Sequence, residues 1–298
     1  MEKILTLVSN NKNIITPLRI EAIEYLIKLK TAKIWLNENI ACDISFSTKA
    51  GNEISSDTMM RLSKLLNSFE YDWSIQNKKD RGKKIFMSDM DSTIIKQECI
   101  DEIAYYADIQ EEVIGITKMS MEGHIPFEEA LKRRVSLLKG IKLEALNEIY
   151  NNKIQITDGA DTLLKTLKKV NIRTILVSGG FTFFTDKLSK KLGFDENYAN
   201  TLEVNDKYLT GKLLSPIIDG SSKKKVLNDT VRRLKVDRND VIAVGDGAND
   251  IEMINAAGLG ISYKAKEILK QHSDGQINYT NLESILYFIG VPKIDFYN

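Results

Sequence analysis

The stretch KKIFMSDMDST, Lys83–Thr93, joins a short apolar run to two closely spaced aspartates. The apolar residues Ile85–Met87 are bounded by charged residues, a pattern that predicts a buried strand. Asp89 and Asp91 follow at the end of that strand, with two hydroxyl side chains directly after them. Two carboxylates this close repel each other unless a cation or a shared proton offsets their charge. The stretch therefore predicts a strand that delivers acidic groups to a functional site.

Two later apolar runs end in a similar way. Thr174–Val177 is followed by Ser178 and two glycines, and Asp240–Val244 is followed by the sequence GDGAND, Gly245–Asp250. Strands alternate here with amphipathic helices such as Ala160–Val170, which predicts a parallel sheet with helices on both faces. Ligands bind beyond the carboxyl ends of the strands in such sheets. We therefore expect the three polar clusters to meet at one edge of the sheet.

The expected meeting point gathers carboxylates and contains no histidine. A site of oxygen ligands favours a hard cation, and Mg²⁺ also prefers phosphate oxygens as partners. A carboxylate can attack phosphorus to form an aspartyl phosphate, and a second acid can protonate the departing alkoxide. Asp89 and Asp91 suit these two roles. Loop amides at Ser178 and Gly179 suit phosphoryl oxygens, and Lys223 is the candidate point charge.

The composition fits one large or two modest domains. The 298 residues include 42 basic and 41 acidic ones, and this near balance gives no case for nucleic-acid binding. Cys42 and Cys99 have no C-x-x-C spacing, which argues against a disulfide scaffold or a zinc site. No apolar run approaches the ~18 residues of a membrane span, and the N-terminus lacks the pattern of a signal peptide. We therefore expect a cytoplasmic protein that binds neither membranes nor nucleic acids.

Residues 1–80 predict a small α+β unit that precedes the main domain. Three apolar or alternating runs predict strands, and two runs with helical spacing predict helices, the second with Ser56 as its N-cap. In chain order these elements are strand Ile4–Val8, helix Ile20–Lys30, strand Ala41–Phe46, helix Ser56–Leu66 and strand Tyr71–Ile75. The polar run Gln76–Lys84 marks the expected boundary. Residues 81–298 form the expected main domain, with a helical insertion at about residues 97–156.

These motifs resemble those of the phosphoserine phosphatases in the haloacid dehalogenase (HAD) superfamily. The four motifs stand in the order of that superfamily, at DMDST (Asp89–Thr93), SGGF (Ser178–Phe181), Lys223 and GDGAND (Gly245–Asp250). The helical segment is similar to the family's cap in Glu98, Asp101–Ala104, Met121–Gly123, Phe127–Glu128 and Arg133–Leu138. The resemblance covers about residues 83–290. Residues 1–80 resemble the ACT-like domain that some longer members carry.

The resemblance implies an α/β protein with a doubly wound parallel sheet, a HAD-like Rossmannoid core, and a helical cap inserted after the first core strand. It implies Mg²⁺-dependent hydrolysis of O-phospho-L-serine to L-serine and phosphate through an aspartyl phosphate, the last step of L-serine biosynthesis. Asp89 is then the nucleophile and Asp91 the acid and base. The implied metal ligands are the Asp89 side chain, the Asp91 carbonyl and Asp246, supported by Asn249 and Asp250.

The implied substrate contacts divide between the core and the cap. They are Ser178, Gly179 and Lys223 at the phosphate, with Asn249 beside them, and Glu98, Arg134 and Phe127 in the cap. A zwitterionic amino acid calls for one fixed anion and one fork-shaped cation, and arginine can bind a carboxylate through two hydrogen bonds. The resemblance therefore assigns Glu98 to the amino group and Arg134 to the carboxylate, while Phe127 shapes the pocket.

Several of these residues also have ordinary structural interpretations. The run Lys223–Lys225 fits a solvated basic face, and only the resemblance selects Lys223. Glu98 fits a helix N-terminal acid that the helix dipole favours. Arg133 and Arg134 are adjacent and point in different directions on a helix, so the residues alone do not choose between them.

Two other functions stay open at this point. The first is another small-molecule phosphomonoesterase of the superfamily, or a phosphotransferase with an acceptor such as homoserine. The second is an amino-acid-sensing regulatory protein, which the N-terminal unit suggests. The sequence also leaves open the choice between monomer and homodimer, ligand binding by residues 1–80, the preference among phosphorylated amino acids, and how far the cap opens.

Overall fold

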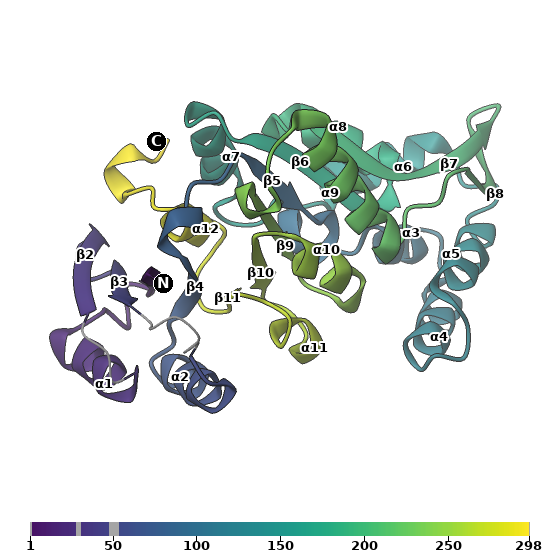
Figure 1. Cartoon of the computed structure of the whole chain (residues 1–298). Coiled ribbons are helices and arrows are strands. Elements are labelled where there is room, and N and C mark those ends of the chain that lie inside the picture. Colours follow the sequence, from purple (N-terminus) through teal and green to yellow (C-terminus); the bar gives the residue numbers. More distant parts are fainter. Residues whose placement is uncertain (1, 28–30, 48–53, 298) are drawn as a thin grey trace.

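A computed structural model describes residues 2–27, 31–47 and 54–297. Within these ranges the strands form one eleven-stranded sheet, in the order β2-β3-β1-β4-β11-β10-β9-β5-β6-β7-β8 (Figure 1). The strands of the main part are β5 (Ile85–Ser88), β6 (Arg173–Phe181), β7 (Glu196–Asn205), β8 (Tyr208–Leu214), β9 (Val241–Gly245), β10 (Leu259–Tyr263) and β11 (Gly275–Ile277). Those from β11 to β7 run parallel, and β8 returns antiparallel to β7 as a hairpin.

Helices cover both faces of the parallel strands, as the sequence predicts. Successive side chains of a strand point to opposite faces. Phe86 accordingly belongs to the core beneath α7 (Ala160–Lys169) and α8 (Thr182–Leu192). Its neighbours Ile85 and Met87 belong to the core beneath α9 (Gly220–Leu234), α10 (Ile251–Ala256) and α11 (Glu267–Lys270). Since β6 and β9 lie on either side of β5, the strand order reverses there, which is where such sheets form ligand crevices.

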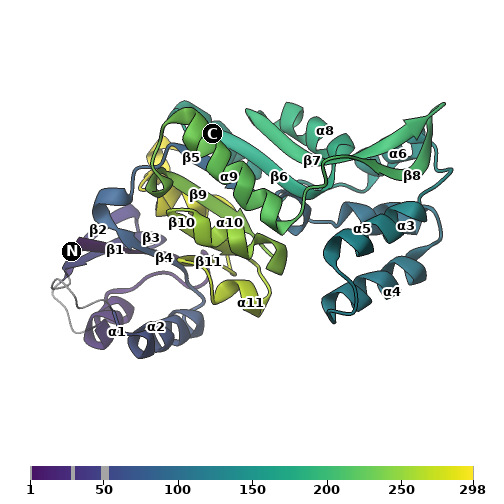
Figure 2. The ribbon, with the colours of Figure 1, turned by 45° about the vertical axis from the view of Figure 1, so that its right-hand side comes forward.

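A helical insertion, residues 97–156, follows β5. Its helices are α3 (Cys99–Tyr106), α4 (Gln110–Met121), α5 (Phe127–Ser136) and α6 (Leu143–Asn152). The segments entering and leaving it lie side by side, because the Lys96 N–H donates to the Gln155 carbonyl at 2.9 Å. The α5–α6 turn is held by the β7–β8 hairpin, where the Leu209 N–H donates to the Ile141 carbonyl at 2.8 Å. In Figure 2 the insertion and the N-terminal helices lie at opposite ends of the molecule.

The N-terminal residues form a βαββαβ arrangement. Its elements are β1 (Glu2–Val8), α1 (Pro17–Ile27), β2 (Thr31–Asn37), β3 (Ala41–Ser47), α2 (Ser56–Ser68) and β4 (Asp72–Asn77). Ser55, rather than the predicted Ser56, caps α2, because its hydroxyl accepts from the Thr58 N–H. β2 was not predicted from the sequence, because its mostly exposed side chains give no buried stripe. The predicted end of the first helix, at residues 28–30, lies outside the described residues.

The N-terminal strands continue the main sheet. β4 pairs antiparallel with β11, with Ser74 opposite Gly275 and Trp73 opposite Gln276. The approach is close, because a Cβ at Gly275 would lie 2.7 Å from the Ser74 Cβ. The polar run Gln76–Lys84 therefore separates the two parts along the chain but not in space. The sequence analysis missed β11 because its three residues give no periodic signal.

Asp72 anchors this junction. Its buried carboxylate accepts hydrogen bonds from the backbone N–H groups of Asn278 (2.6 Å), Tyr279 (3.0 Å) and Thr280 (2.8 Å). We expect Asp72→Asn to lower the free energy of unfolding by about 2 kcal/mol. The NH₂ group of the asparagine side chain would face backbone N–H groups, and two donors cannot form a hydrogen bond with each other. Urea denaturation measures this change. The same substitution at Asp186, exposed on α8, is expected to change the stability by less than about 0.5 kcal/mol; equal effects at both positions would contradict the assignment.

None of the helices in the described residues combines the length and apolar character that crossing a bilayer requires.

Candidate active site

Asp89 stands at the carboxyl end of β5 and is 3% exposed. Its N–H still donates to the Val244 carbonyl of β9 at 3.0 Å, so the sheet fixes its backbone. Its Oδ1 accepts from the Met90 N–H at 2.8 Å. The chain then turns sharply through Ser92, whose φ of 54° is left-handed. Asp89 is thus fixed by the sheet, and Asp91, just before this turn, faces Ser178 of the neighbouring strand β6.

Lys223 lies in the first turn of α9 and is fully buried. Its Nζ donates to Asp89 Oδ1 at 2.8 Å and to Asp250 Oδ1 at 2.7 Å. Burial alone would lower the pKa of Lys223, but the carboxylates of Asp250 and Asp89 outweigh it and raise that pKa. Its neighbour Lys224 reaches outward to a surface ion pair with Glu252. Of the lysine run, Lys223 is thus the one inside the site.

Asp246 and Asp250 follow β9. Asp250 is fully buried, and its Oδ2 accepts from the N–H groups of Asp246 (3.1 Å) and Gly247 (3.2 Å). A Cβ at Gly245 would lie 2.4 Å from the Asp250 Cγ, so this close approach requires glycine. Burial, with the Asp250 carboxylate next, raises the pKa of Asp246 to about 6. The GDGAND motif therefore folds back on itself and concentrates negative charge beside β5.

Three carboxylates form an acidic cluster suited to a metal ion. One oxygen each from Asp89, Asp246 and Asp250 lie within 4.8 Å of one another. Burial, followed by Asp250, raises the pKa of Asp89, although Lys223 opposes this shift. An oxygen-only donor set with surplus negative charge fits a hard divalent cation. Asp250, which the sequence predicts in a supporting role, contributes one carboxylate oxygen to this cluster.

The side chain of Asp91 faces a different set of groups. Its Oδ1 accepts from the Cys99 N–H at 2.9 Å, and its Oδ2 accepts from the Ser178 hydroxyl at 3.2 Å. Burial raises the pKa of Asp91. A Cβ at Gly180 would lie 2.7 Å from Asp91 Oδ2, so the second glycine of SGGF makes room for the carboxylate. The side chains of Asp89 and Asp91 thus have different hydrogen-bond partners.

The insertion contributes Glu98 and Phe127 to the edge of the site. Glu98 Oε1 accepts from the Ser92 hydroxyl at 2.7 Å. Desolvation by the surrounding protein, with the nearby Asp91 carboxylate next, raises the pKa of Glu98 to about 7. A Cβ at Gly179 would lie 3.4 Å from Phe127 Cζ, so the phenyl ring reaches the end of β6. Both residues therefore connect the insertion with the polar ends of the strands.

Arg134 turns into the insertion while Arg133 turns outward. Arg134 Nη1 donates to the Thr117 hydroxyl at 3.4 Å. Burial lowers the pKa of Arg134, although the carboxylates of Asp101 and Glu98 act in the opposite direction. Arg133 pairs on the surface with Glu129, one helical turn earlier. The orientation of α5 thus separates two arginines that the sequence could not distinguish.

Asn249 and Asp219 complete the surroundings of the acidic cluster. Asn249 is exposed and lies over Gly247, where a Cβ would be 2.5 Å from its Oδ1. Asp219, which was not predicted from the sequence, caps α9 by accepting from the Ser222 N–H at 2.8 Å. The sequence Asp219-Gly220-Ser221-Ser222 at the start of a basic helix is the N-cap signal that could have identified it. The cap fixes the helix turn that carries Lys223.

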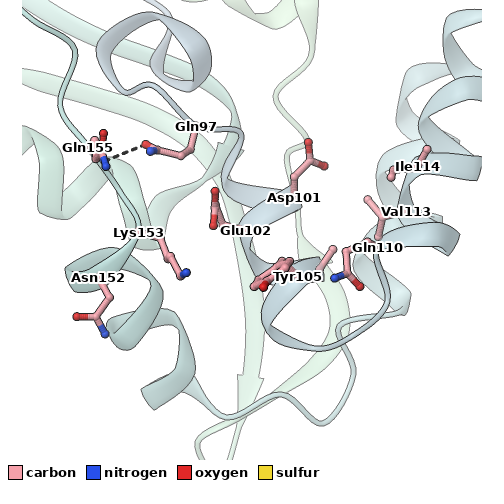
Figure 3. Close-up of a pocket in the computed structure, with 11 residues that line it drawn as sticks. Gln97, Asp101, Glu102, Tyr105, Gln110, Val113, Ile114, Asn152, Lys153 and Gln155 are labelled. Carbon is pink, nitrogen blue, oxygen red and sulfur yellow. Dashed lines mark hydrogen bonds between the residues drawn. The ribbon is translucent and has the colours of Figure 1, made fainter.

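A cavity of about 660 Å³ lies within the insertion rather than over the aspartates. It is lined by residues of α3, α4 and the end of α6, including Glu102, Tyr105 and Lys153 (Figure 3). Gln97 and Gln155, from the two connecting segments, also line it, and the Gln155 N–H donates to Gln97 Oε1 at 2.9 Å. This cavity is therefore distinct from the acidic cluster.

The arrangement of acidic strand ends and buried lysine agrees with comparisons to known proteins. Residues 83–258 match the haloacid dehalogenase-like hydrolase family. The chain therefore belongs to this family of hydrolases. A phosphoserine phosphatase of Archaeoglobus fulgidus is 43% identical over 213 residues, which cover 72% of this chain and 62% of that one. The match thus spans less than two thirds of that relative.

Two solved structures are similar over different extents. A HAD family hydrolase from Salmonella enterica serovar Typhi, t0658, matches 97% of this chain and 99% of its own, with 29% identity and a TM-score of 0.86. A phospho-aspartyl intermediate analogue of phosphoserine phosphatase matches 70% of this chain and 99% of its own, with 40% identity and a TM-score of 0.65. The first match therefore includes the N-terminal strands as well as the main part.

Proposed function

We propose that this protein hydrolyses O-phospho-L-serine to L-serine and phosphate through an aspartyl phosphate on Asp89. The observation that carries the proposal is that two different sets of residues occur together, one at the strand ends and one in the insertion. The strand ends supply a nucleophilic carboxylate beside a buried lysine, and the insertion supplies an acid and an inward-facing arginine. Relatives named phosphoserine phosphatase, at 43% and 40% identity, support this choice of substrate.

In the proposed first step, the Asp89 carboxylate attacks phosphorus and the bond to the serine oxygen breaks. Asp91 gives its proton to the departing alkoxide, and its raised pKa is consistent with a carboxyl group that holds a proton. In the second step, Asp91 takes a proton from the water that attacks the aspartyl phosphate, which releases phosphate and restores Asp89. Lys223, the Ser178 hydroxyl and the Gly179 amide hold the phosphoryl oxygens.

We propose Mg²⁺ as the cofactor, because the donor set consists of oxygen atoms only. The side chains of Asp89 and Asp246 and the backbone carbonyl of Asp91 would hold it, with Asp250 and Asn249 in support. Bound there, the ion would reduce the repulsion between the Asp89 carboxylate and the incoming phosphate.

The proposed role of the insertion is to recognise the amino acid. Glu98 binds the ammonium group, Arg134 binds the carboxylate, and Phe127 closes the pocket over the loop at Gly179. A closed insertion also limits the access of water during phosphoryl transfer. This division predicts that the insertion governs the choice of substrate, while the strand ends govern the chemistry.

Replacing Arg134 by alanine tests this division. We expect kcat/KM for O-phospho-L-serine to fall by about 100-fold, because the substrate carboxylate loses a charged partner. Hydrolysis of 4-nitrophenyl phosphate, which has no such carboxylate, is expected to change by less than about threefold. Arg133→Ala is the matched control and should leave both rates nearly unchanged, since Arg133 pairs on the surface. Equal losses on both substrates in Arg134→Ala would contradict the assigned role.

We further propose that residues 1–80 are an ACT-like unit and that the protein serves serine synthesis in the cytoplasm. The two helices on one face of a βαββαβ sheet support the first proposal. The two buried free cysteines fit a reducing compartment.

Deleting residues 1–80 would be a poor test of regulation, because it would also expose the edge of β11. Serine inhibition of the full-length protein is the better measurement.

A further inference from the structure

Asn200 is a fully buried amide at the junction of two segments that the proposed chemistry uses. It lies on β7 opposite Phe181, where the pairing of β6 and β7 is irregular. Its Nδ2 donates to the Gly179 carbonyl at 2.8 Å and to the Ile218 carbonyl at 3.0 Å. Its Oδ1 accepts from the Ile218 N–H at 2.8 Å. One side chain therefore satisfies backbone groups of two separate segments, the irregular end of β6 and the loop before α9, using both of its donor hydrogens.

The irregular end of β6 carries Ser178. The carbonyl of the Gly179–Gly180 peptide accepts from Asn200, and the N–H of the same peptide donates to Ser178 Oγ at 2.8 Å. The Ser178 hydroxyl in turn donates to Asp91 Oδ2 at 3.2 Å. A planar peptide bonded at both ends cannot rotate without losing one of these bonds. Asn200 therefore fixes the orientation of the hydroxyl that faces Asp91.

The loop before α9 leads directly to Lys223. Ile218 precedes Asp219, which caps α9, and Lys223 follows one turn later. Two hydrogen bonds between Asn200 and Ile218 hold this entry to the helix against β7. Asn200 therefore bonds directly to both the Ser178 segment and the entry to the Lys223 helix.

We propose that Asn200 is a positioning residue that holds the Ser178–Gly180 end of β6 and the Lys223 helix at the spacing a phosphoryl group requires. The proposal rests on the proposed function for its substrate, but it concerns only the phosphoryl end of that substrate. The hydrogen-bond partners of Asn200 are Gly179 and Ile218, not the residues proposed to bind the amino acid. Its loss therefore affects all phosphate esters alike, in contrast to the loss of Arg134.

Asn200→Asp is the most direct test, because aspartate has nearly the same shape as asparagine. It replaces the Nδ2 donor group by an oxygen acceptor, which would face the carbonyl groups of Gly179 and Ile218. We expect kcat/KM to fall by about 100-fold for O-phospho-L-serine and for 4-nitrophenyl phosphate, since small displacements of reacting groups cost this much. We also expect the inhibition constant of inorganic phosphate to rise by about tenfold. Asn197→Asp, the same change three residues earlier on β7, is the control and should alter each value by less than about threefold.

Thermal unfolding separates positioning from folding. Rates are measured well below the unfolding temperature of each variant, and if Asn200→Asp does not fold, Asn200→Ala is assayed in the same way. Normal kcat/KM and phosphate inhibition in the folded variant, with only a lower unfolding temperature, would overturn the proposal. Equal losses in Asn197→Asp would also overturn it. If the unmodified protein hydrolyses 4-nitrophenyl phosphate but not O-phospho-L-serine, the proposed substrate is wrong. The rates with 4-nitrophenyl phosphate then still test the role of Asn200.

Discussion

Replacing Asp89 by asparagine is expected to reduce phosphate release by at least about 10⁴-fold, because the amide cannot form the aspartyl phosphate. Asp89 is the carboxylate at the end of the central strand, and Lys223 holds its Oδ1 at 2.8 Å. No acid-stable phosphoenzyme should accumulate when the variant is quenched during turnover. Quenched-flow trapping with labelled substrate, alongside steady-state phosphate release, measures both quantities.

The fold of this variant is expected to persist. Burial and the neighbouring carboxylates of Asp250 and Asp246 raise the pKa of Asp89, so a neutral group there removes repulsion. Lys223 keeps its contact with Asp250. The free energy of unfolding should therefore change by less than about 1 kcal/mol. Turnover close to that of the unmodified protein would contradict the role of Asp89 as nucleophile.

Replacing Lys223 by methionine is expected to lower both activity and stability. Methionine fills a similar volume but leaves Asp89 and Asp250 buried beside each other without the ammonium group. We expect the free energy of unfolding to fall by about 3 kcal/mol in the presence of a chelator. Phosphate release should fall by about 10³-fold, because the transferring phosphoryl group loses its fixed charge.

Lys224→Met is the matched control for this change. Lys224 lies one residue further along α9 and pairs with Glu252 at the surface, so its replacement should alter stability by less than about 0.5 kcal/mol. Urea denaturation in a chelator and phosphate release compare the two variants. Equal stability of Lys223→Met and the unmodified protein would show that Lys223 does not offset the repulsion between Asp89 and Asp250.

The central part of the fold could be predicted because its signals are local. Apolar runs such as Ile85–Met87 become strands buried on both faces, and the polar residues after them meet where parallel strands end. Asp89 and Asp246 come together for this reason. The family resemblance then selected Lys223, which lies inside the site while Lys224 turns outward.

Other features depend on contacts that sequence periodicity does not report. The pairing of β4 with β11 joins residues about 200 positions apart, and three-residue β11 carries no pattern of its own. The place of Asp250 within the acidic cluster depends on the chain folding back over Gly245. Asn200 escaped notice because a single asparagine in a strand has no distinctive spacing, although its importance follows from three hydrogen bonds.

The most direct test is phosphate release from a panel of phosphorylated amino acids by the full-length protein, with Mg²⁺ and with a chelator. The panel contains O-phospho-L-serine, O-phospho-L-threonine, O-phosphohomoserine and 4-nitrophenyl phosphate. The account predicts the highest kcat/KM for O-phospho-L-serine, and a loss of activity in the chelator that added Mg²⁺ reverses. Full activity in the chelator, or a clear preference for another ester, would contradict it.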